Sequence, residues 1–509
     1  MWRFRSRLFA AASAIVCGCV IAAARPRYGG TLRIETHAVL RTLDPAATPL
    51  DVSDAAARTR LLPLVFETLV APDPAGGLRP LLATSWERDA QGTRWRFQLR
   101  PDVRLHDGSR LDPAEVASTL RARVDSWQVS SADEAIVIAS DRALPDLPWV
   151  LTDVRFAISM RRASGDVVGS GPFRVERLEA GRLSLRAHED YWAGRPFVDA
   201  VQIDMGVVPP EQLSHLELGR VDLVAVNAPD VRRVSQRGLR LVESRPLELM
   251  ALVFDVNRPT PVGEPIRRAL ALAIDRAAMC TILLQRHAQP APALLPQWLS
   301  GYASLLAVAI DRAAMCTILL QRHAQPAPAL LPQWLSGYAS LLAVRLDRAQ
   351  ARTIVGARPA AQRALTLRVD PSDSLAHAIA ERIAVDAREA GLFIKVEAPD
   401  TLAPRPDVRL VRVRLDAKSP DLALARALAA LGPRTTALVA PDAPPEPGAS
   451  LADVYRYERA LIEGNAIIPV VHLPEIYALG ARVESWNGPL ILATGAWDLA
   501  AVWLGADKP

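Results

Sequence analysis

The fold is decided in residues 63–120, which read PLVFETLVAPDPAGGLRPLLATSWERDAQGTRWRFQLRPDVRLHDGSRLDPAEVASTL. Turn-forming PDPAGG and RDAQGT separate short runs, and the run RWRFQLR alternates apolar and polar residues, so the region predicts β-hairpins. Beyond them, Asp112 is a candidate N-cap, Pro113 takes the first helical position and Glu115 the third. This order predicts that a helix begins at residue 113.

Strand patterns continue on both sides of this block. GGTLRIET (29–36) alternates as an opening strand should, and GPFRVERLEAGRLSLRAHE (171–189) predicts a hairpin. Later, ALTLRVD (364–370) predicts a strand, followed by a helix capped at Ser372 or Ser374 that stops at Gly391 before the strand LFIKVE. A chain of 509 residues exceeds the size of one core, so we predict an α/β protein of at least two lobes.

The N-terminus predicts an export signal. Arg3, Arg5 and Arg7 precede an apolar run that ends in small residues at cleavage-site spacing, and the alternative is a single membrane anchor. The run VCGC (16–19) also has the form of a lipoprotein processing site, in which Cys19 would carry the lipid. We therefore expect a periplasmic or extracytoplasmic protein, and lipidation at Cys19 remains an alternative.

The charge, the cysteines and the missing catalytic motifs argue against several classes of protein. The net charge of +5 comes mostly from the leader and from a duplicated segment, and no basic block resembles a nucleic-acid footprint. Outside the leader, Cys280 and Cys316 are copies of one residue, so no disulfide framework is expected, and Cys280 is interpreted as a buried apolar side chain. No nucleophile, phosphate-loop or zinc motif occurs after the leader, which predicts a non-enzyme without a cofactor.

One stretch is present twice. Residues 273–308 read AIDRAAMCTILLQRHAQPAPALLPQWLSGYASLLAV, and residues 309–344 repeat them without a difference. Solenoids need three or more units that diverge, so we interpret this as an in-frame duplication or an assembly error. We expect the first copy to keep its helix and pack it through Ala277 and Ile282, and the helix of the second copy to lie on the surface or to be poorly ordered.

Several segments in order resemble the extracellular solute-binding proteins of ABC importers, in the class that binds peptides, oligopeptides and nickel. They are GGTLRIET, TLDPA (42–46), the block 63–120, GSGPFRV with HEDYWAGRP, LELGRVDL, PIRRALALAIDRAAM and IIPVVHLP. The resemblance implies a type II two-lobed clamp with an extra subdomain in the first lobe. It places lobe I at 25–246 after a signal at 1–24, the subdomain at about 46–167, lobe II at 247–465, and a returning segment at 466–509.

The resemblance also supplies candidate ligand contacts. Asp416, in RLDAKSPDLAL, takes the position of an aspartate that pairs with a ligand ammonium in peptide binders, although the family's neighbouring tryptophan and tyrosine are absent. An ordinary loop aspartate is the alternative reading. Asn257 is a second candidate, with a turn cap as its alternative. Ser170 and Gly171, in GSGP, offer free backbone amides near the crevice.

The implied function is capture of a peptide-like or other small solute and its delivery to an ABC permease and ATPase. We expect a monomer that binds no nucleic acid and meets the membrane only through the permease or a lipid anchor. An orphan sensor without transport, or a degenerate paralogue that no longer binds, are the alternatives.

Overall fold

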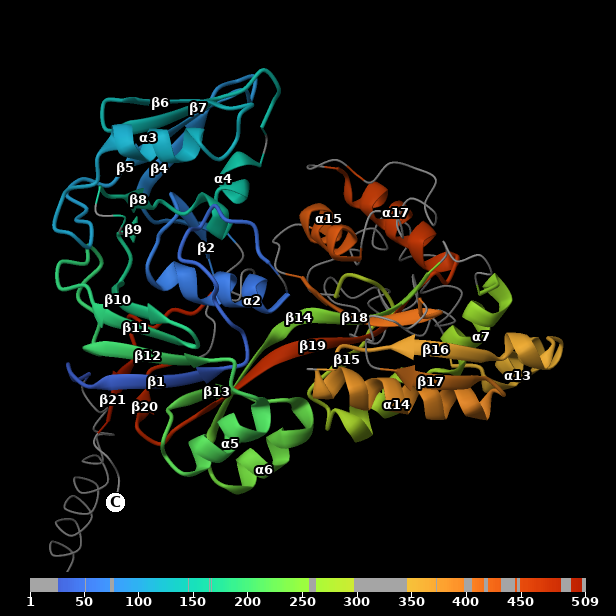
Figure 1. The fold of residues 1–509 in the computed structure, drawn as a ribbon. Helices are drawn as coiled ribbons and strands as arrows, with labels where there is room; N and C mark the ends of the chain where they lie inside the picture. The colour runs from blue at the N-terminus through green and yellow to red at the C-terminus, as the bar shows by residue number, and fades with distance from the viewer. Residues whose placement is uncertain are drawn as a thin grey trace, which may run out of the picture.

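The computed structural model describes residues 26–50, 52–73, 77–144, 146–163, 165, 167–255, 262–296, 346–371, 373–397, 405–415, 420–431, 445, 449–486 and 496–505. Two lobes lie side by side, and two long strands connect them through the middle of the molecule (Figure 1). The α/β, two-lobed architecture predicted from the sequence is confirmed.

One eleven-stranded sheet runs through both lobes in the order β10-β11-β12-β1-β13-β19-β14-β18-β16-β17, with β15 paired to β19. Its strands are β10 (Phe173–Glu179), β11 (Arg182–Ala187), β12 (Ala200–Met205), β1 (Thr31–Thr36), β13 (Leu223–Ala225), β19 (Ile467–Leu479), β14 (Arg240–Phe254), β18 (Val408–Arg414), β16 (Ala364–Arg368), β17 (Phe393–Glu397) and β15 (Gln289–Pro290).

The connecting strands are β14 and β19. They pair antiparallel from Arg240 opposite Leu479 to Val253 opposite Ile467. At one end β19 also pairs with β13 of lobe I, and at the other end β14 pairs with β18 of lobe II. Most of β19 is buried, as expected for a near-continuous apolar strand covered on both faces. Within the described residues, these two strands therefore carry the chain from one lobe to the other.

Lobe I is built from both ends of the chain. Strand β1 runs parallel to β12 and β13, and the predicted hairpin forms β10 and β11, with Gly181 at φ +83° in its turn. The same core contains Trp486 and Trp497 from the C-terminal segment. The other elements of this lobe are α2 (Val52–Leu61), η1 (Leu62–Leu64), α5 (Pro209–Glu217), η3 (Ala228–Asp230), α6 (Val231–Gln236), β20 (Val483–Glu484) and β21 (Trp503–Leu504).

A smaller sheet with its own core projects from lobe I, in the order β4-β5-β7-β6 (Figure 1). The predicted helix α3 begins as expected, because the Asp112 carboxylate accepts a hydrogen bond from the N–H of Ala114 at 2.9 Å. Elements of this region are β2 (Val70–Pro72), β3 (Leu78–Pro80), β4 (Ala83–Arg88), β5 (Arg94–Leu99), α3 (Pro113–Arg121), β6 (Gln128–Ala132), β7 (Ala135–Ala139), α4 (Leu147–Val150), η2 (Val154–Phe156), β8 (Met160–Arg161) and β9 (Val167–Val168).

Lobe II contains the predicted strand-helix-strand unit, in which β16 and β17 pair in parallel and α14 (Ser374–Glu389) crosses between them. Its cap differs from the prediction. Asp373, rather than Ser372 or Ser374, accepts the hydrogen bond from the N–H of Ala376, because a carboxylate there also accepts from Arg412. The remaining elements are α7 (Glu264–Ala273), α8 (Arg276–Ala278), η4 (Met279–Leu283), α13 (Arg348–Gly356), η6 (Ala360–Gln362), α15 (Pro420–Leu431) and α17 (Leu451–Glu463).

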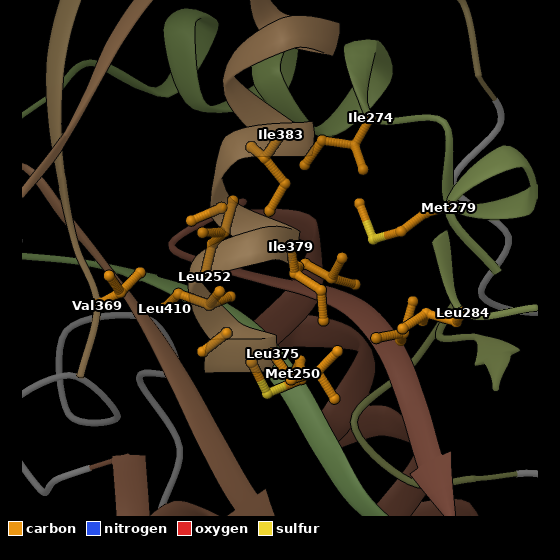
Figure 2. Packing of buried hydrophobic residues seen from close by; sticks show 14 of the residues in the cluster. Met250, Leu252, Ile274, Met279, Leu284, Val369, Leu375, Ile379, Ile383 and Leu410 are labelled. Atoms are coloured by element: carbon orange, nitrogen blue, oxygen red, sulfur yellow. The ribbon is translucent and has the colours of Figure 1, made fainter. Parts of the chain in front are cut away.

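The first copy of the duplicated stretch packs into the lobe II core. Figure 2 shows Ile274 and Met279 pointing toward Ile379 and Ile383 of α14. The expected single helix is wrong, because α7 ends at Ala273, Ile274 is extended and a new turn begins at Arg276. The packing face also differs: Ile282 is 70% exposed. Residues 297–345, which include the whole second copy, lie outside the described residues.

Tertiary contacts cause this break. The Asp275 N–H donates to the Asp386 carboxylate at 3.0 Å, and the Asp275 side chain accepts from Ala278 N–H as a new cap. The buried Arg276 guanidinium donates to the carbonyl of Pro469 at 2.8 Å. Cys280 is buried as expected, and burial raises the pKa of its thiol to about 12.

Candidate functional site

A cavity of about 1310 Å³ lies between the two lobes. Lobe I provides most of its wall, from α2, from residues 66–68, from residues 191–195 and from the C-terminal segment around Trp497. Lobe II contributes Ala429 and Ala430 of α15, the helix that faces lobe I in Figure 1. The cavity is therefore bounded by parts that belong to different lobes.

Helix α2 places Arg58 in the wall of this cavity. The guanidinium donates to the backbone carbonyls of Asp44 and Pro45 at 2.8 and 2.9 Å, which holds the TLDPA segment against the helix. Burial lowers the pKa of Arg58, and the carboxylates of Asp54, Asp44 and Asp153 oppose that shift. The side chain therefore keeps a positive charge inside lobe I and fixes the shape of the adjoining loop.

Glu67 is the most enclosed carboxylate in the cavity wall, with 4% of its surface exposed. Ser170 Oγ donates to Oε2 at 2.8 Å, Tyr191 Oη donates to Oε1 at 2.9 Å, and the Trp192 indole N–H lies 3.1 and 3.0 Å from both oxygens. Burial raises the pKa of Glu67 to about 7, although these hydrogen bonds stabilise the charged form. This carboxylate fixes two aromatic side chains at the cavity edge.

The GSGP loop (residues 169–172) packs against the segment that carries Glu67. The Gly171 N–H donates to the carbonyl of Val65 at 2.9 Å, and a Cβ on Gly171 would lie 2.6 Å from the Val65 carbonyl carbon. Two histidines close the other side of the loop: His106 Nε2 and His188 Nδ1 lie 3.0 and 3.1 Å from the Gly171 carbonyl oxygen. Burial lowers the pKa of His106 to about 4, so this histidine is neutral at physiological pH.

A charged network lies where the connecting strands leave lobe I. Glu475 of β19 accepts from Arg60 of α2 at 2.8 Å and from Arg414 of β18 at 2.6 Å. Burial alone would raise the pKa of Glu475, but Arg414 and Arg60 outweigh it and hold the pKa at about 2. The network joins lobe I, a connecting strand and lobe II through one carboxylate.

The predicted site residues fall into two groups. Ser170 and Gly171 are described: Ser170 is 1% exposed with its hydroxyl engaged by Glu67, and the cavity wall continues at the next residue, Pro172. Asp416, Asn257 and Cys19 lie outside the described residues. The described neighbours of Asp416 are Leu415, which directly follows β18, and Pro420, at the start of α15.

Sequence reasoning missed Glu67, Tyr191 and Arg58 as wall residues. Glu67 stands alone as an acid in the apolar run PLVFETLV, which is an unusual position for a charge. That signal marks a buried carboxylate but does not name its partners, because Tyr191 is 124 residues away in the chain. Trp192 is half-buried and also lines the cavity.

The described part of the chain holds no group of three or more His, Cys, Asp or Glu side chains placed to bind a metal ion. In the same residues, we find no helix with the length and hydrophobicity that crossing a bilayer requires.

Comparison with known families agrees with this geometry. The family model for bacterial extracellular solute-binding proteins, family 5 (middle region), matches residues 77–305. The match spans less than half of the chain, so the similarity to family 5 is shown over residues 77–305. The match covers the small sheet, the GSGP loop, the Tyr191–Trp192 pair and most of the first duplicated copy.

Solved structures show the same fold over nearly the whole chain. NikA from Staphylococcus aureus, in complex with Ni(L-His)2, superimposes with a TM-score of 0.71 at 14% identity, covering 93% of this chain and 100% of NikA. The murein tripeptide binding protein MppA from Escherichia coli gives 0.69 at 16% identity, covering 93% and 98%. The oligopeptide-binding protein AppA from Bacillus subtilis, in complex with a nonapeptide, gives 0.66 at 13% identity, covering 94% and 100%. These family 5 neighbours are binding proteins.

Similarity to curated proteins covers less of the chain. The HTH-type transcriptional regulator SgrR from Pectobacterium atrosepticum is 32% identical over 241 residues, which is 44% of this chain and 41% of the regulator. SgrR from Yersinia pestis is 28% identical over 258 residues, 47% of this chain and 44% of the regulator. The matched segment thus spans less than half the length of these relatives.

Proposed function

We propose that the protein is an extracytoplasmic receptor of an ABC importer, which captures a peptide-like or other small solute and delivers it to a membrane permease. The observation that carries this proposal is the cavity of about 1310 Å³ bounded by lobe I and by α15 of lobe II. It exceeds the roughly 300–1,000 Å³ of a common small-molecule pocket, so a solute of several residues fits.

The connection between the lobes supports a clamp mechanism. Among the described strands of the large sheet, β14 and β19 are the two that run from one lobe to the other, so bending them would open or close the cavity. Closure would bring Ala429 and Ala430 toward the Tyr191–Trp192 edge and exclude water from the solute. The protein would act alone on its ligand, as a monomer, and change no covalent bond in it.

The division of the chain follows from the same clamp. We propose lobe I at 25–246 with its subdomain at about 46–167, lobe II at 247–465 and the return to lobe I at 466–509. Residues 1–24 would be removed on export, with Cys19 as the lipid attachment point in the alternative reading. Asp416 and Asn257 remain proposed ligand contacts of lobe II, and Ser170 and Gly171 act through Glu67 in lobe I.

Native mass spectrometry of the exported protein, purified without denaturation, tests the function. We expect a small-molecule adduct that is lost when Ala430 becomes Trp, because the larger side chain fills the cavity from α15. Ala425, exposed on the same helix and absent from the wall, provides the matched Ala425→Trp control. An adduct that persists in Ala430→Trp, or an empty protein whose melting temperature no solute shifts, would reject the proposal.

The SgrR relatives favour a second candidate, a sensor that uses the same clamp without transport. Uptake of the radiolabelled adduct molecule by cells with and without the gene separates the two. Uptake that depends on the gene supports the receptor. Unchanged uptake, combined with a lost transcriptional response to the solute, supports the sensor.

A further inference from the structure

Three arginines line the cavity in the described residues, and they differ in what they bind. Arg195 is paired with Glu189 and Asp199 at 2.6 and 2.7 Å. Arg58 donates to two backbone carbonyls. Arg79 has neither a hydrogen bond nor an ion pair to the protein in the part of the chain that the structure describes. Among the described residues of this wall, the Arg79 guanidinium is therefore the cation that remains available to bind a solute.

Arg79 lies beside the Glu67 group. It sits in β3, where it pairs with Ala71 of β2, and its side chain is partly exposed. Arg79, Glu67 and Tyr191 line the same cavity, and the positive charge of Arg79 lowers the pKa of both other groups. A solute held by Arg79 would thus meet the Tyr191–Trp192 edge of the cavity.

The acidic groups of the same wall are already engaged. Both oxygens of Glu67 accept hydrogen bonds from protein donors. Asp153 accepts from the N–H of Arg155 at 3.0 Å, and Asp498 accepts from the N–H of Ala500 at 3.2 Å. Arg79 adds a fork of donors to this side of the cavity, which is complementary to an anion.

We propose that Arg79 binds a carboxylate group of the solute, beside the Tyr191–Trp192 edge of the cavity. The inference rests on the proposed solute-binding function and adds a subsite in lobe I. A planar guanidinium matches a carboxylate in two parallel hydrogen bonds. A carboxylate fits better than a phosphate dianion, because Glu67 lies close by and a second negative charge would increase the repulsion.

A pair of probes that differ in one group tests this. Isothermal titration calorimetry at pH 7.5 compares trialanine with trialanine amide on the purified full chain. We expect the amide to bind at least about tenfold more weakly, the scale of one charge-assisted hydrogen-bond pair. Arg79→Gln should weaken trialanine by a similar factor and leave the amide unchanged, and inorganic phosphate should not compete.

Because Arg79 makes no hydrogen bond or ion pair to the residues that the structure describes, Arg79→Gln should keep the parental melting temperature, so a loss of affinity is not a loss of folding. Arg94→Gln is the matched control: Arg94 is exposed in the same subdomain and lies outside the wall. Equal affinities for the two peptides, or equal losses for both in Arg79→Gln, overturn the proposal. Failure of both peptides to bind also overturns it, while a co-purifying adduct in mass spectrometry would still support the receptor.

Discussion

Glu67 and Glu475 are both buried, and their surroundings shift their pKa values in opposite directions. Glu475 lies between two guanidinium groups that hold its pKa at about 2, and Glu67 has neutral donors and a pKa raised to about 7. The neutral donors and the charge of Arg79 lower the pKa of Glu67 by less than burial raises it, so burial decides the outcome for Glu67.

These shifts have opposite effects on stability. A folded-state pKa above the ordinary value of 4.5 means that Glu67 contributes stability at low pH and loses it as the pH rises from about 4.5 to about 7. The folded-state pKa of Glu475 is below 4.5, so its contribution is present above pH 4.5 and is lost as the pH falls toward 2.

Glu67→Gln isolates the first effect, because glutamine has a similar shape and does not titrate. The free energy of unfolding of the variant, relative to the parent protein, should rise by about 3 kcal/mol between pH 4 and pH 8. Urea denaturation at both pH values measures it. Glu463→Gln, at an exposed ion pair with Arg459, is the control and should show no such trend. A difference that is constant with pH would contradict the assignment of a raised pKa.

Among the elements, the GSGP loop shows how a backbone turn supports a side-chain site. Gly171 approaches Val65 so closely that a methyl group would lie 2.6 Å from its carbonyl carbon and 2.7 Å from its oxygen. Val65 is two residues before Glu67, and Ser170 donates to the Glu67 carboxylate. A displaced loop would therefore disturb both the backbone and the hydrogen bonds of the cavity wall.

Gly171→Ala should lower the free energy of unfolding by about 2 kcal/mol or more, because neither backbone can yield without strain. Thermal denaturation measures the loss. Gly356→Ala is the matched control, since a Cβ there meets nothing within 4 Å and the residue ends α13 at a negative φ. It should be neutral or stabilise by up to about 1 kcal/mol. Equal effects in the two variants would show that the close approach to Val65 is not limiting.

Elements whose causes are local could be predicted from the sequence. The cap at Asp112, the turn at Gly181 and the stop at Gly391 depend on neighbouring residues, and all three are confirmed. The end of α7 at Ala273 depends on Asp386, 111 residues from Asp275, so no window of sequence contains its cause. The cavity wall could not be predicted for the same reason: Glu67 and its aromatic partners lie far apart in the sequence and come together only in the folded chain.

At the scale of the whole molecule, the duplication adds 36 residues that repeat a segment already present. The first copy supplies Ile274, Met279 and Leu284 to the lobe II core, where they contact α14 (Figure 2). Removing either copy gives the same sequence, since the two are identical. One copy is therefore sufficient to make every contact that the described core receives from this stretch.

Deletion of Ala309–Val344 should leave the melting temperature unchanged or raise it, and should reduce aggregation. Calorimetry and light scattering measure these effects. In the parent protein, limited trypsin digestion should cut at Arg312 and Arg322 long before Arg276, whose guanidinium is buried and bonded to Pro469. A deletion variant that melts lower, or cleavage at Arg276 as fast as at Arg312, would show that the second copy is structural.

The way lobe I is assembled has a consequence for biosynthesis. Strand β1 is among the first described residues to leave the ribosome, and Trp486, Trp497 and Val502, which share its core, are among the last. Lobe I therefore cannot close until translation is nearly finished, while α14 and most of its partners in lobe II are already present. A nascent chain would expose unfinished apolar surface in its N-terminal half for most of its synthesis, and chaperones would have their greatest effect there.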